Sequence, residues 1–70
     1  MTKKEAKEAI ENGEKLTHRF FEPEEFITLA IDGTGRYVTE DGFLIQPAVF
    51  WKDRANECFN EGWEIFKIQQ

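Results

Sequence analysis

The chain has 70 residues, a formal net charge of −5 and a single cysteine. A chain of this length forms one domain at most, so residues 1–70 are predicted to be a single domain that needs very good packing or self-association. One cysteine excludes an internal disulfide, one isolated histidine excludes a Cys/His zinc site, and the acidic charge disfavours direct binding to DNA or to anionic membranes.

The first predicted element is a short amphipathic helix over residues 3–12. Thr2 and Glu5 have the spacing of a capping box, in which each side chain accepts a hydrogen bond from the backbone N–H of the other residue. Gly13 ends the helix, because glycine adopts the left-handed conformation without penalty. The apolar side chains recur at helical spacing on one face, which we expect to pack on the rest of the domain: Ala6, Ala9 and Ile10.

The middle of the chain predicts an antiparallel meander of short strands. Runs rich in β-branched and aromatic residues alternate with turns that contain glycine or proline. Connections of only a few residues favour antiparallel pairing of neighbours. The strands are predicted at residues 15–21, 26–31, 36–39 and 43–45, with turns at 22–24, 32–35 and 40–42.

The last part of the chain predicts a second helix and a final strand. Aromatic residues recur near the helical period between Pro47 and Gly62, which favours a helix within residues 48–61. Residues 63–68 then alternate as a strand. The fold class is therefore predicted to be α+β, with an N-terminal helix packed on an antiparallel sheet of four to five strands and a second short helix before the last strand.

The sequence disfavours an enzyme. His18 is suited to general-base chemistry, but the chain has no serine, and Cys58 is predicted to be a buried, inert thiol in the second helix. The glycine-rich residues 32–35 lack the lysine and the following helix of a phosphate loop, so they are predicted to form a hairpin turn. We expect no catalytic residues, no cofactor and no metal.

The aromatic residues outnumber the positions that so small a core offers. We assign one group to the core: Phe26, Phe43, Phe59, Trp63 and Phe66. The remaining rings are expected to be partly exposed, to face another subunit or to stack on a ligand: Phe20, Phe21, Tyr37, Phe50 and Trp51.

Several of these rings lie near cations, and arginine with an aromatic ring is the pairing that holds a nucleotide, through phosphate and base respectively. The candidate ligand-binding residues are His18, Arg19, Phe21, Tyr37, Trp51 and Arg54. We expect His18 and Arg19 to point outward while Leu16 enters the core. For any single arginine, the alternative is a surface side chain that lies over a ring without binding anything.

Two segments carry a family resemblance: EAKEAIENGEKLTHRFF (5–21) and EGWEIFKI (61–68). They resemble small phage proteins of the Thoeris anti-defence type, which open with a helix ending in glycine and close on a strand with a tryptophan-glutamate pair. The matching residues are Glu5, Ala6, Glu8, Ala9, Gly13, Lys15, Trp63 and Glu64. The chain departs from the family pattern at His18, in place of arginine, at Phe20-Phe21, in place of glycine-tryptophan, and at Gly62, in place of an acid.

The resemblance implies a phage protein of immune evasion, a sponge that binds a signalling nucleotide made by a bacterial defence system and that self-associates into a homo-oligomer. Related short phage proteins instead inhibit a host defence protein directly, in the anti-CRISPR or anti-restriction manner. The sequence therefore leaves two functions open, nucleotide sequestration and an acidic, protein-binding inhibitor. The lone thiol and the lack of a signal-like or membrane-spanning run predict a cytoplasmic location, which the resemblance places in an infected bacterial host.

Overall fold

The structure is a computed structural model that describes residues 1–67. Its elements follow the predicted order: α1 (Lys3–Glu11), β1 (Leu16–His18), β2 (Ile27–Leu29), β3 (Tyr37–Thr39), β4 (Leu44–Ile45), α2 (Pro47–Asp53), the short 3₁₀ helix η1 (Glu57–Phe59) and β5 (Trp63–Ile65). The predicted α+β class is confirmed, with the first helix on an antiparallel sheet and the second short helix before the last strand.

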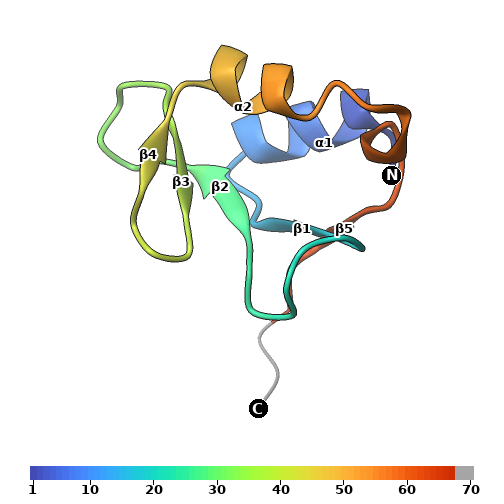
Figure 1. The fold of residues 1–70 in the computed structure, drawn as a ribbon. Helices are drawn as coiled ribbons and strands as arrows, with labels where there is room; N and C mark the ends of the chain where they lie inside the picture. The colour runs from blue at the N-terminus through green and yellow to red at the C-terminus, as the bar shows by residue number, and fades with distance from the viewer. Residues whose placement is uncertain (68–70) are drawn as a thin grey trace.

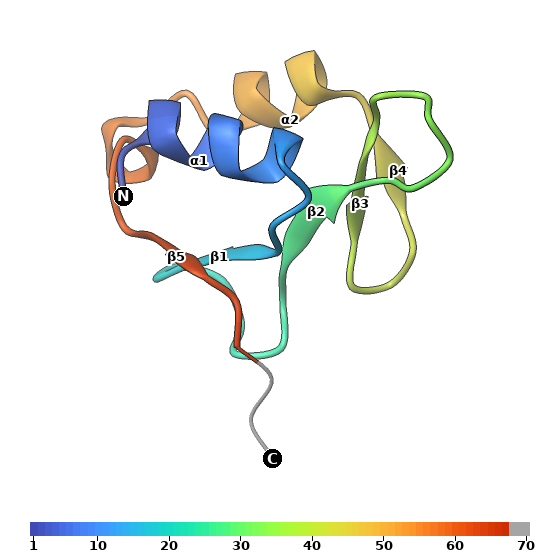
Figure 2. The ribbon, with the colours of Figure 1, turned by 180° about the vertical axis from the view of Figure 1, so that it is seen from behind.

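The sheet has five strands in the order β4-β3-β2-β1-β5, and all neighbours are antiparallel. The last strand therefore returns to the far edge and pairs with the first. Both helices lie on one face of the sheet (Figures 1 and 2), and no helix covers the other face in either view. The connection from α2 through η1 runs around the side of the molecule to reach β5 (Figure 1).

The start of α1 has the predicted capping box. The Thr2 hydroxyl accepts from the Glu5 N–H at 3.2 Å, and the Glu5 carboxylate accepts from the Thr2 N–H at 2.9 Å. These bonds hold the pKa of Glu5 below its ordinary value. The helix buries Ala6 and Ile10 against the sheet, as its spacing predicts.

The core lies between the helices and the sheet. Leu16 and Ile27 are directly opposite each other on β1 and β2, and both are buried. Alternation along each strand sends their neighbours to the other face. The buried hydrophobic cluster consists of Ala6, Ile10, Leu16, Ile27, Tyr37, Phe50 and Trp63.

Every predicted strand is shorter in the structure than expected, and two differences from the predicted elements change the path of the chain. The strand predicted at 15–21 ends at His18, because the carbonyl of His18 accepts from the Phe21 N–H at 2.8 Å and turns the chain. The helix predicted within 48–61 is wrong beyond Asp53: α2 ends there and η1 follows separately. This break lets the chain return to β5, where the Trp63 indole N–H donates to the carbonyl of Phe59 at 2.8 Å. Residue 68 of the predicted last strand lies outside the described residues.

The assignment of rings to core and surface was partly wrong. Tyr37 is 3 % exposed and Phe50 is 2 % exposed, whereas Phe43, which we expected in the core, is 66 % exposed. Tyr37 and Phe50 face each other between β3 and α2, with ring centroids 5.4 Å apart. Cys58, predicted to be buried, is half-buried. Among residues 1–67, no helix has the length and apolar character needed to span a membrane.

Candidate functional site

Trp63, at the start of β5, organises the aromatic side chains on the helix-covered side. Its side chain is 1 % exposed. The rings that pack around it have centroids 4.8–6.2 Å away. We call this group the Trp63 cluster, which consists of Trp63, His18, Phe21, Phe50, Trp51 and Phe59. Three of the predicted ligand-binding residues therefore belong to one internal cluster: His18, Phe21 and Trp51.

His18 is the first correction to the predicted site. The expectation that it points outward is wrong, because the side chain is 2 % exposed. Its Nε2 donates to the carbonyl of Glu61 at 2.7 Å, and its Nδ1 accepts from the Phe20 N–H at 3.1 Å. A carbonyl only accepts and a backbone N–H only donates, so these partners place the single imidazole proton on Nε2. Both nitrogens are engaged within the protein, and neither is available to a phosphate.

Arg19 is exposed, as predicted, and lies at the end of β1. Its guanidinium carbon is 5.4 Å from the centre of the Phe20 ring, and Phe20 is itself 61 % exposed. The backbone N–H of Arg19 donates to the carbonyl of Gly62 at 3.2 Å. Gly62 has a φ of +92°, and a Cβ added there would lie 3.0 Å from both Arg19 Nε and His18 Nε2. Because Gly62 has no side chain, the side chains of His18 and Arg19 can both approach its backbone closely.

We expect Gly62→Ala to destabilise the protein more than Gly33→Ala. Both glycines have positive φ, at +92° and +78°, so both substitutions carry a backbone cost of about 1–2 kcal/mol. Only at Gly62 does the new methyl group also meet a side chain, since a methyl group at Gly33 would have no atom beyond its chain neighbours within 4 Å. The additional steric cost is about 1–3 kcal/mol. Urea unfolding of both variants measures the difference, and equal free energies of unfolding would contradict this close approach.

Tyr37 and Trp51, predicted to stack on a ligand, are bonded to each other. The Trp51 indole N–H donates to the Tyr37 hydroxyl at 3.0 Å. Burial raises the pKa of Tyr37 above its ordinary value, and the Trp51 bond opposes that rise. Trp51 is half-buried and has Lys7 of α1 over its ring, with the ammonium nitrogen 5.2 Å from the ring centre. Tyr37 is therefore a core residue, and Trp51 retains a partly exposed ring.

Arg54, at the end of α2, has the most unusual environment of the predicted residues. Its guanidinium carbon lies 4.0 Å from the centre of the Phe50 ring and 5.7 Å from that of Phe21. Its Nη1 donates to the carbonyl of Phe50 at 3.3 Å, while its Nε is buried and has no hydrogen-bond partner among residues 1–67. Burial lowers the pKa of Arg54, and the charges of Asp53 and Glu25 oppose this shift. The group remains a cation, because arginine does not deprotonate in proteins.

The structure thus brings Phe21 and Arg54 together and adds Phe50, which the sequence had placed among the surplus rings without a binding role. Phe50 and Arg54 are four residues apart near the end of one helix, a spacing at which side chains meet, so this partner was recognisable from the sequence. The position of Lys7 over the Trp51 ring was not recognisable from the sequence, because this contact requires the packing of α1 on α2. We define the candidate site as Phe21, Phe50, Trp51 and Arg54.

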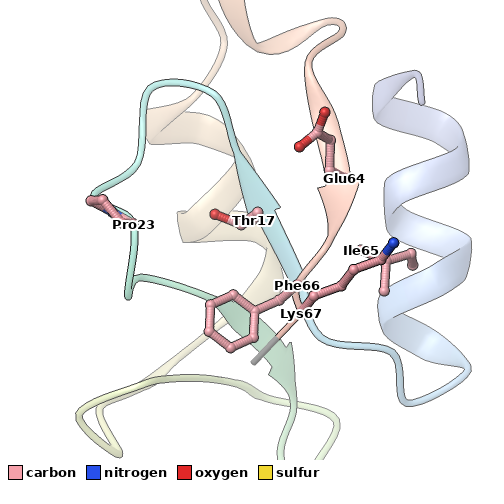
Figure 3. Close-up of a pocket in the computed structure, with 6 residues that line it drawn as sticks. All are labelled: Thr17, Pro23, Glu64, Ile65, Phe66 and Lys67. Atoms are coloured by element: carbon pink, nitrogen blue, oxygen red, sulfur yellow. The ribbon is translucent and has the colours of Figure 1, made fainter. Parts of the chain in front are cut away.

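A separate hollow of about 640 Å³ lies on the sheet face opposite the helices. Its lining residues come from β1, β5, the turn after β1 and the chain following β5: Thr17, Pro23, Glu64, Ile65, Phe66 and Lys67 (Figure 3). None of the predicted site residues lines it. The candidate site, the half-buried guanidinium of Arg54 among aromatic rings, is therefore separate from this hollow.

Within residues 1–67, no group of three or more His, Cys, Asp or Glu side chains is arranged to hold a metal ion. Comparisons of the chain with family models, with curated proteins and with solved structures found no match.

Proposed function

We propose that this protein binds and sequesters a small anionic nucleotide without catalysis, as a phage counter-defence protein in a bacterial host. The observation that carries the proposal is the state of Arg54. Its guanidinium is stacked on Phe50, lies beside Phe21 and forms no ion pair within 4 Å to a described residue. A half-buried cation that forms no direct ion pair is costly, and an incoming phosphate would relieve that cost.

The chemistry of the neighbours suits a nucleotide better than a simple anion. A phosphate oxygen would accept from the guanidinium, while Phe21 and Trp51, which are both half-buried, are the aromatic rings that a base would contact. His18, the residue best suited to proton transfer, has both ring nitrogens bonded to backbone groups. This arrangement supports binding rather than catalysis.

Self-association is part of the same proposal. Phe20 and Phe43 are 61 % and 66 % exposed, and solvent-exposed rings of this size favour contact with another protein surface. Light scattering on protein purified from cells, combined with the ratio of absorbance at nucleotide and protein wavelengths, measures mass and bound nucleotide together. An oligomer that carries nucleotide supports the proposal, and a bare monomer contradicts it.

We expect Arg54→Lys to weaken nucleotide binding by at least tenfold, about 1.4 kcal/mol, because lysine keeps the charge but loses the planar, forked donors. Arg54→Gln, which also removes the charge, should bind more weakly still. Calorimetry against a panel of cyclic di- and trinucleotides and cyclised ADP-ribose products identifies the ligand and ranks the variants.

Arg36→Lys is the matched control. Arg36 pairs with Asp32 at 3.2 Å in the loop between β2 and β3 and has no ring of the candidate site beside it. Its substitution should leave binding unchanged. If no nucleotide in the panel binds, while the protein retains a host protein in a salt-sensitive manner, the result rejects sequestration and favours the acidic inhibitor instead.

A further inference from the structure

The sheet face without helices, which we call the open face, is a second candidate surface. Leu16, Ile27 and Tyr37 are buried on the helix-covered face. Alternation along the strands therefore directs their neighbours Thr17 and Val38 to the open face. Glu64 joins them, because it is directly opposite Thr17 in the pairing of β5 with β1. Neither view of the fold shows a helix over this face (Figures 1 and 2).

The hollow described above lies at the β5 end of the open face. Thr17 and Glu64, which are opposite each other on β1 and β5, contribute a hydroxyl and a carboxylate to the lining, and Phe66 and Pro23 contribute apolar surface (Figure 3). The Phe66 ring packs on Phe26 with centroids 4.8 Å apart, which holds the ring in place. The hollow therefore combines an aromatic face, a carboxylate and a hydroxyl, while its volume of about 640 Å³ falls within the range that accommodates a ligand.

The lining of the hollow carries one carboxylate, on Glu64, and one ammonium group, on Lys67. Glu64 is exposed and forms no ion pair within 4 Å to any residue between 1 and 67. The Lys67 side chain ends beside Ile65 in the view of Figure 3, and the Lys15 ammonium nitrogen lies 5.0 Å from the centre of the Phe26 ring. Glu22 and Glu24 are exposed and are the chain neighbours of Pro23, so the segment that contributes Pro23 to the lining is acidic.

We propose that the open face binds a protein partner through an arginine side chain that enters this hollow. A guanidinium stacks on an aromatic ring, forms a forked pair of hydrogen bonds with a carboxylate, and keeps donors for a hydroxyl. Phe66, Glu64 and Thr17 provide these three partners at one place. The unpaired Glu64 and the acidic segment around Pro23 favour a basic segment of a protein over an anionic ligand. This inference is independent of nucleotide binding, since it uses none of the residues around Arg54.

The test is a titration of the isotopically labelled full chain with the peptide acetyl-Gly-Arg-Gly-amide, followed by NMR. We expect saturable shifts of the Thr17, Glu64 and Phe66 amides, with affinity in the millimolar range because one side chain supplies the contacts. The same peptide with lysine should bind at least several-fold more weakly. The peptide with citrulline, which keeps the shape and lacks the charge, should produce no saturable shift.

Glu64→Gln should weaken binding of the arginine peptide at least tenfold. Core resonances at the same positions as in the original protein would show that the variant is folded. Glu57→Gln is the matched control, because Glu57 is also exposed but lies on η1, outside the hollow. Lack of saturable shifts, shifts of equal size with citrulline, or an unchanged affinity in Glu64→Gln would each overturn the proposal. The Arg54→Gln variant should bind the peptide normally, which separates this surface from the nucleotide site.

Discussion

Trp63→Ala is expected to remove about half or more of the free energy of unfolding. Truncation of a buried tryptophan costs about 3–5 kcal/mol, and a domain of this length has a total stability of about 4–10 kcal/mol. The loss is at the upper end here because Trp63 is 1 % exposed and forms the centre of the Trp63 cluster, so the cavity would open among rings that cannot all move inward. The substitution also removes the donor that ties β5 to η1.

Trp63→Phe separates the packing contribution from the hydrogen bond. Phenylalanine retains much of the apolar contact with Phe21 and Phe50, but it leaves the carbonyl of Phe59 without its donor. We expect an intermediate loss of about 1–3 kcal/mol. Urea unfolding monitored by circular dichroism measures both variants.

Phe43→Ala provides the control for aromatic content. Its side chain is 66 % exposed, so removal should change the free energy of unfolding by no more than about 0.5 kcal/mol. If Trp63→Ala unfolds with nearly the stability of the original protein, the central role of Trp63 is wrong.

Local signals were sufficient to predict the fold class. The capping box at Thr2 and Glu5, and the glycine turns between the strands, act over a few residues and are therefore visible in the sequence. The end of α2 was not visible, because the helical period continues past Asp53. The chain leaves the helix there and returns to the sheet, where β5 pairs with β1, and this pairing is a tertiary requirement.

The aromatic residues show the same limit of prediction from the sequence. Phe50 and Trp51 are adjacent, and periodicity alone does not determine which of the two turns fully inward. The structure buries Phe50 and leaves Trp51 half-buried, with the Trp51 indole N–H donating to the Tyr37 hydroxyl. The burial of Tyr37 follows from its position opposite Leu29 on the helix-covered face of the sheet, a register that the sequence does not display.

The predicted site residues show the same difference between local contacts, which the sequence displays, and long-range contacts, which it does not. Phe50 and Arg54 are close in sequence, so their stacking was accessible from helical spacing. The acceptor of His18 is the carbonyl of Glu61, which is 43 residues away, and only the pairing of β1 with β5 brings them together. In the sequence, His18 beside Arg19 therefore resembled an anion site. In the structure, the His18 side chain is buried and connects β1 to the segment before β5.

His18→Phe is expected to lower the free energy of unfolding by about 2–4 kcal/mol, although phenylalanine keeps a ring in the same place. The reason is that two partly buried backbone groups lose the partners that the buried imidazole provides: the carbonyl of Glu61 loses the Nε2 donor at 2.7 Å, and the N–H of Phe20 loses the Nδ1 acceptor at 3.1 Å. Ring packing on Phe59 and Trp63, at 4.7 and 4.8 Å, should be largely preserved.

His18→Asn tests this account, since its side-chain oxygen reaches roughly the position of Nδ1 and restores the acceptor for Phe20. We expect it to recover about 1 kcal/mol relative to the phenylalanine variant. Nucleotide affinity, measured by calorimetry under conditions where each variant is folded, should be unchanged, because both imidazole nitrogens bond within the protein. The opposite result, a stable His18→Phe protein that has lost its ligand, would return His18 to the binding site and show that its ring turns outward when the ligand is present.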